Sequence, residues 1–199
     1  MSKSYPVFPD IVIEGDLQLD ANIASRLSAA VKQEQAKKNI INTPAGWETS
    51  KFVPLKNDLQ KLQSLIIRTF FADIQKEYTA AKKMKIELVR PNLLSIKPGQ
   101  NAYRKFERRR WYTGIVWIQT TNAGSHLTLH APQSKIYSTP DGVLYAEKYQ
   151  THITPAQFKY VFWPSHLEYS FTTNHSMVDT VMLEFTITGA IPGLPESKI

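Results

Sequence analysis

Histidine and glutamate supply the side chains of this sequence that could bind a metal ion. His166 and Glu168 lie two positions apart in a segment typical of a strand, so both would share one face of it. Imidazole and carboxylate groups together suit a divalent transition metal. His126 and His130 would also share a face, but residues four apart on a strand are ~13 Å apart, too far to share one ion. A histidine alone on a strand more often packs or forms hydrogen bonds, and we expect that role here.

A strongly basic segment is a second source of binding chemistry. Five of the seven residues from 104 to 110 are lysine or arginine. Guanidinium groups bind carboxylates and phosphates through paired hydrogen bonds, and aromatic rings stack on flat groups. The segment therefore predicts either a binding edge for an acidic partner or a solvated loop with internal ion pairs. The residues that would form such an edge are Arg104, Arg108, Arg109, Arg110, Trp111 and Tyr112.

The composition excludes several classes of site. The 199 residues contain no cysteine, which excludes disulfides, thiolate metal sites and a cysteine nucleophile. The motifs of serine hydrolases, phosphate-binding glycine loops and zinc proteases are not found in the sequence. No run approaches the ~20 apolar residues of a membrane helix, and the first residues lack the apolar core of a signal peptide. The net charge of +7 permits an acidic partner, such as nucleic acid or an acidic protein surface.

Two amphipathic helices are predicted in the first half of the chain to support these residues. The first is capped by Asp20 and ends near Lys38, because apolar residues recur every four positions between them. The second runs from about residue 57 to about 82, with its apolar residues on one stripe. Pro44 and Gly46 indicate a loop between the two helices.

Strands are predicted from residue 86 onward, where β-branched and aromatic residues are frequent. Pro140-Asp141-Gly142 favours a turn, and hence a protruding hairpin. Two helices followed by about eight strands predict an α+β fold, a double-stranded β-helix (jelly roll) with two N-terminal helices packed on one face. We expect one domain over residues 1–190 and an extended arm over 191–199. The predicted strands are 86–96, 111–121, 126–130, 135–138, 143–149, 158–163, 168–172 and 180–188.

Several short motifs occur in an order and spacing that resemble one protein family. They are Gly46-Trp47-Glu48-Thr49, Asn92 to Gly99, Thr113-Gly114-Ile115-Val116-Trp117, Pro132, and Trp163-Pro164-Ser165-His166-Leu167-Glu168-Tyr169. Together they resemble a phage-enriched family of 2-oxoglutarate/iron(II) oxygenases over nearly the whole chain. The resemblance implies a double-stranded β-helix that holds iron with two histidines and a carboxylate. It also implies an arginine that binds the distal carboxylate of 2-oxoglutarate.

The resemblance assigns a position to each functional residue, and the residue types at these positions differ from those of the family. The paired histidines fall on Lys105 and Glu107, the aspartate on Ala131, the last histidine on Tyr169 and the arginine on about Thr180. A charged lysine cannot bind a metal, alanine has no ligand atom, and a neutral tyrosine is a poor ligand for iron(II). We therefore expect no metal and no cofactor, with Lys105 beside Tyr169 in the vacated pocket.

These observations predict a non-catalytic, oxygenase-like jelly-roll protein that acts as a phage virion structural, assembly or interaction component, in the virion or the host cytoplasm. One alternative is an active iron(II)/2-oxoglutarate-dependent hydroxylase, with His166 and Glu168 as displaced ligands. Another is a basic nucleic-acid-binding module. We expect other proteins as partners, with nucleic acid or another acidic surface also open and no membrane contact. The contact residues would be the basic edge named above with Tyr137 and Tyr145 of the hairpin.

Overall fold

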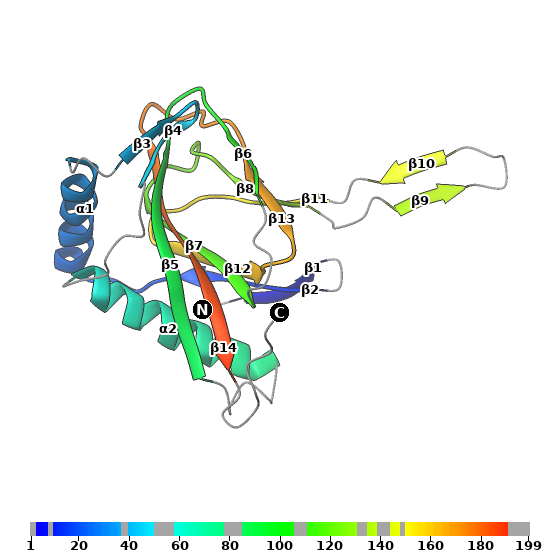
Figure 1. The fold of residues 1–199 in the computed structure, drawn as a ribbon, viewed down its shortest axis with the longest axis horizontal. Coiled ribbons are helices and arrows are strands. Elements are labelled where there is room, and N and C mark those ends of the chain that lie inside the picture. The colour runs from blue at the N-terminus through cyan, green and yellow to red at the C-terminus, as the bar shows by residue number, and fades with distance from the viewer. Residues whose placement is uncertain are drawn as a thin grey trace.

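Two β-sheets lie face to face in the computed structural model, and two helices pack against the larger sheet (Figure 1). The structure describes residues 3–7, 10–36, 40–49, 58–77, 85–105, 111–130, 135–138, 144–147 and 150–190. The helices are α1 (Ala21–Ala36) and α2 (Asp58–Glu77). No helix in the described ranges is long and apolar enough to cross a membrane.

The strands divide into a larger sheet, a smaller sheet and a separate hairpin. In chain order they are β1 (Lys3–Val7), β2 (Asp10–Asp16), β3 (Ile40–Thr43), β4 (Gly46–Thr49), β5 (Lys85–Ile96), β6 (Ala102–Lys105), β7 (Tyr112–Gln119), β8 (Leu127–His130), β9 (Lys135–Ser138), β10 (Leu144–Glu147), β11 (Gln150–Ile153), β12 (Lys159–Pro164), β13 (Glu168–Phe171) and β14 (Thr180–Ala190). The larger sheet has the order β1-β2-β12-β7-β14-β5-β4-β3, and the smaller sheet has the order β11-β8-β13-β6. The chain changes sheet at every step from β5 to β8 and again at every step from β11 to β14, which is the connectivity of a jelly roll.

The inward and outward residues of the larger sheet belong to two separate cores. On β14, Leu183 and Phe185 pack with the helices, whereas Met182 packs with residues between the two sheets. Successive strand residues point to opposite faces, so this division follows from the alternation of the sequence. The core between the sheets, which we call the inner cluster, includes Trp117, Trp163, Tyr169 and Phe171.

The helices have the caps and apolar stripes that the sequence predicts. Asp20 accepts a hydrogen bond from the backbone nitrogen of Ile23 at 2.8 Å, which fixes the start of α1. The stripe of α2 is fully buried, and Phe70 lies at its centre, with ring centroids 5.0–5.6 Å from Trp111, Tyr112 and Phe162.

A buried carboxylate ties α2 to the sheet. Asp73 accepts hydrogen bonds from the Tyr160 hydroxyl at 3.0 Å and from the Lys76 ammonium at 2.8 Å. A buried carboxylate needs such partners, because its desolvation is costly. The helix is therefore held by polar contacts as well as by its apolar stripe.

The prediction of two helices followed by strands is wrong in its order. Strands β1 and β2 come before α1, and β3 and β4 lie between the helices. Ile11, Val12 and Ile13 of β2 are consecutive apolar residues with neighbours on both faces, so the strand has no alternating pattern. The later predicted strands are confirmed, with α2 ending at Glu77. The expected arm, 191–199, lies outside the described residues.

Candidate functional site

Two glycines of the motifs shared with the oxygenase family allow neighbouring groups to pack closely against the backbone. A Cβ atom on Gly46 would lie 2.2 Å from the carbonyl oxygen of Ser95, so β4 can approach β5 only with glycine there. A Cβ atom on Gly114 would lie 2.5 Å from the ring of Phe185 and 2.7 Å from the ring of Phe162. These motifs maintain the scaffold, whatever occupies the site.

The hydroxyl groups of two further motifs meet across neighbouring strands. Thr113 of β7 is the register partner of Trp163 of β12, and its hydroxyl lies 2.9 Å from that of Ser165. Both hydroxyls are buried and satisfy each other. The Thr-Gly and Trp-Pro-Ser motifs therefore form one structural unit.

The position mapped to the last histidine of the family is occupied by a buried tyrosine. The Tyr169 side chain is 1% exposed, and its ring centroid lies 4.9 Å from that of Trp163. Its hydroxyl donates a hydrogen bond to Oε1 of Glu184 at 2.5 Å. Glu184 is half-buried on β14, on the face that carries Met182 into the inner cluster. The position mapped to the last histidine therefore carries a buried side chain whose hydroxyl is hydrogen-bonded.

Lys105 of β6 is the register partner of Tyr169 on β13. The register concerns the backbones, and the expected place of the Lys105 side chain beside Tyr169 stays a prediction. The Lys105 side chain, Glu107 and Ala131 lie outside the described residues.

The position mapped to the arginine is Thr180, which is also buried and hydrogen-bonded. Its hydroxyl oxygen accepts a hydrogen bond from the backbone nitrogen of Ser125 at 3.2 Å, and it lies 3.5 Å from the hydroxyl of Thr120. A Cβ atom on Gly124 would lie 2.7 Å from this oxygen. The position where the resemblance implies an arginine therefore carries a buried, hydrogen-bonded threonine.

Iron(II) does not fit the described part of the mapped set. A facial triad needs two histidines and a carboxylate with free electron pairs. The Tyr169 hydroxyl donates a hydrogen bond to Glu184, and the Thr180 hydroxyl accepts one from the backbone nitrogen of Ser125. Within the described ranges, no group of three histidine, aspartate or glutamate residues could hold a metal ion.

The histidines of the sequence do not converge on one point. His166 is exposed in the turn before β13, whereas Glu168 begins that strand. His130 Nε2 lies 2.8 Å from the Ser170 hydroxyl, on the face of β8 opposite the inner cluster. His152 Nδ1 lies 2.9 Å from the hydroxyl of Thr128. Both contacts are of the hydrogen-bonding kind that lone strand histidines usually make.

One residue of the predicted partner edge is wrongly assigned. Tyr112 is 1% exposed, packs on Phe70 and donates a hydrogen bond from its hydroxyl to the carbonyl oxygen of Ile11 at 3.3 Å. It follows Trp111 into β7, where the alternation turns it toward α2, and a core residue offers no surface to a partner. Trp111 is half-buried at the edge of the same core. The Arg104 side chain and residues 106–110 lie outside the described part of the chain.

The hairpin is confirmed as β9 and β10, which pair with each other as a sheet of their own and project from the roll in Figure 1. Tyr137 is the register partner of Tyr145, and Lys135 is the partner of Glu147. The contact role of Tyr137 and Tyr145 stays a prediction.

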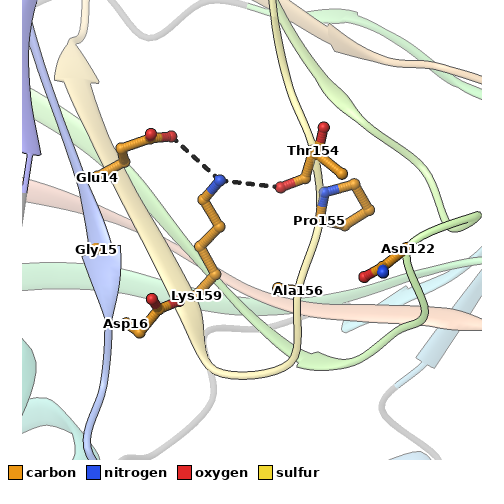
Figure 2. A pocket seen from close by; sticks show the side chains of 8 residues that line it. All are labelled: Glu14, Gly15, Asp16, Asn122, Thr154, Pro155, Ala156 and Lys159. Carbon is orange, nitrogen blue, oxygen red and sulfur yellow. Dashed lines mark hydrogen bonds and ion pairs between the residues drawn. The ribbon is translucent and has the colours of Figure 1, made fainter.

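A polar hollow of about 380 Å³, not anticipated from the sequence, lies at another part of the roll (Figure 2). Its lining comes from two strands and two loops far apart in the sequence, so no local motif signals it. Lys159 crosses the hollow to Glu14, with 3.2 Å between ammonium and carboxylate, and also donates to the carbonyl of Thr154 at 3.1 Å. The lining residues are Glu14, Gly15, Asp16, Asn122, Thr154, Pro155, Ala156 and Lys159.

Known proteins resemble this chain in structure rather than in sequence. No protein-family model matches it, and no curated protein sequence does. AviO1 from Streptomyces viridochromogenes Tue57 superposes with a TM-score of 0.65 at 10% identity, over 93% of this chain and 91% of that one. A prolyl-4-hydroxylase from Pseudomonas putida gives 0.61 at 12% identity, over 89% and 92%. An oxidoreductase of the 2OG-Fe(II) oxygenase family from Burkholderia pseudomallei gives 0.61 at 10%, over 89% and 84%.

The fold is that of the 2-oxoglutarate/iron(II) oxygenases. The oxygenase fold accounts for the two-sheet roll. At these identities the likeness shows the fold alone, and fold does not determine activity. The activity must be argued from the residues around Tyr169.

Proposed function

We propose that this chain is a non-catalytic protein with an oxygenase fold, and that it acts as a structural, assembly or interaction component of a phage particle. The proposal implies a location in the virion or in the host cytoplasm. The hydrogen bond from Tyr169 to Glu184 is the main support for proposing that the protein is not catalytic. A tyrosine that donates to a carboxylate keeps its proton and is a poor iron(II) ligand.

The surroundings of Tyr169 support the same proposal. Trp163 packs against its ring, and Leu129 lies opposite it on β8, so apolar groups fill the inner cluster around it. An iron(II) oxygenase needs two histidines and a carboxylate as ligands, with further coordination positions left open. A tyrosine held by Glu184 is not such a ligand, whereas the roll itself is kept.

Anaerobic titration with iron(II) and 2-oxoglutarate tests the absence of a metal centre. We expect no saturable binding and no turnover of 2-oxoglutarate by the full chain. The variant His166→Ala with Glu168→Gln is the matched control for a displaced site. Micromolar iron binding with turnover, lost in this variant, would establish the active hydroxylase in place of our proposal.

The separate hairpin supports the interaction part of the proposal. A two-stranded hairpin is marginally stable alone in water, so β9 and β10 would gain most from packing on a second protein. Tyrosine and arginine are enriched at protein interfaces, and the hairpin and the basic segment supply both. We propose that these two segments form the contact with other virion proteins.

A further inference from the structure

The polar hollow shown in Figure 2 is lined by residues of β2 and β12 and of two loops, and Tyr169 is not among them. Lys159 is four residues before Trp163 on β12, a distance of ~13 Å along a strand. On β2 the sequence alternates so that Glu14 and Asp16 share the face of Val12, which belongs to the inner cluster. The loops before β8 and before β12 complete the lining with Asn122 and Thr154. The hollow is therefore an end of the roll interior where the inward residues become polar.

The charged groups of the hollow are unevenly paired. Glu14 and Lys159 are 17% exposed and form an ion pair. Asp16 is the register partner of Lys159 across the two strands, yet its exposed carboxylate forms no hydrogen bond or ion pair with the described residues. The side chain of Asn122 is likewise exposed and unbonded within the described ranges. Within the described residues, the hollow thus keeps an unpaired carboxylate and an unpaired amide beside an ammonium that is already paired.

The local charge selects the class of ligand. Two carboxylates and one ammonium leave a charge of −1 here, in a chain of net charge +7. An anion would meet the repulsion of Glu14 and Asp16. A calcium ion needs six to eight oxygen ligands, and Lys159 already occupies the carboxylate of Glu14. No aromatic ring is among the described residues that line the hollow, so a sugar has no stacking platform there. The net negative charge of the lining favours a small organic cation.

We infer that this hollow binds a guanidinium group. A guanidinium has five donors in a fixed fork, and it can pair with both oxygens of a carboxylate. Asp16 offers that carboxylate, while Asn122 and Thr154 offer further acceptors on the facing loops. The group can belong to a free small molecule or to an arginine side chain of a partner protein. The inference does not depend on whether the region around Tyr169 binds iron.

Calorimetric titration of the full chain with butylguanidine tests this site. We expect saturable binding that Asp16→Asn weakens about tenfold, because a bidentate charge-assisted contact is lost. Asn122→Ala should weaken it about threefold. Glu87→Gln is the control with the same change of charge, since Glu87 is exposed on β5 and pairs with Lys85. It should leave the affinity unchanged.

Two further ligands sharpen the result. Butylamine, which carries an ammonium in place of the guanidinium, should bind at least about threefold more weakly. The peptide acetyl-Gly-Arg-Gly-amide distinguishes the sources: tighter binding than butylguanidine indicates a partner's arginine, and weaker binding indicates a small molecule. No saturable binding at ~10 mM, equal binding of butylamine, or equal weakening by Glu87→Gln would overturn the inference. Melting temperatures of the variants show that each one is folded.

Discussion

The inner cluster around Tyr169 and the hollow around Lys159 are two regions of one roll with opposite character. Around Tyr169 the inward positions carry aromatic rings, and the hydroxyl is bonded to Glu184. Around Lys159 the inward positions of β2 and β12 in the larger sheet carry charges, and Asp16 is left without a partner in the described chain. The scaffold is common to both, so the side chains at alternate positions decide where a ligand can bind.

The largest expected effect on stability comes from removing the Tyr169 ring from the inner cluster. Tyr169→Ala should lower the free energy of unfolding by about 3–5 kcal/mol, because it removes a buried ring from the inner cluster. Tyr169→Phe removes only the hydrogen bond to Glu184 and should cost about 1 kcal/mol. Urea unfolding measures both. A loss below ~1 kcal/mol for Tyr169→Ala would mean that the region is not packed as described.

A glycine substitution tests whether the shared motifs serve the scaffold. Gly114→Ala should cost about 1–3 kcal/mol, because its methyl group would overlap Phe185 and Phe162. Adding Phe185→Leu shortens one of the overlapping side chains, so the two changes should be less destabilising together than their sum. Strict additivity in urea unfolding would argue against a steric role for this glycine.

Breaking the ion pair of the hollow should have a smaller effect. Glu14→Gln leaves Lys159 with the Thr154 carbonyl as its remaining partner, and we expect a loss of about 1 kcal/mol in the free energy of unfolding. The double variant with Lys159→Gln isolates the coupling between the two charges. Zero coupling would show that the pair does not fix the shape of the hollow.

The smallest effect on stability per substituted residue is expected at the basic segment. Changing Arg108, Arg109 and Arg110 together to Ser should cost less than ~0.5 kcal/mol per residue if the segment is a surface contact. Assembly with partner proteins should nevertheless fall. Normal assembly with an unchanged melting temperature would show that this segment has no role in recognition. Salt-dependent binding of generic DNA that the triple change abolishes would instead support the nucleic-acid-binding module.

The sequence predicts those parts of the fold that have local signals. Alternation and β-branched residues identify β5, β7, β12 and β14, and Pro140-Asp141-Gly142 identifies the hairpin. The consecutive apolar residues of β2 have no such period, and its strand is missed.

Neither functional region could be read from local pattern alone. Tyr169 and Glu184 are fifteen residues apart on different sheets, so nothing in the chain marks their hydrogen bond. The hollow combines segments around residues 14, 122, 154 and 159, which only the folded chain brings together.

The hydrogen bond from Tyr160 to Asp73 holds α2 on the larger sheet more firmly than α1 is held. α2 is tied to the sheet by this bond and by its stripe around Phe70, whereas α1 buries only Leu27 and Val31 fully. Regions with fewer buried contacts open locally at lower free energy. The backbone amides of α1 should therefore exchange with solvent deuterium when that helix alone detaches. The amides of α2 should exchange only when the whole roll unfolds.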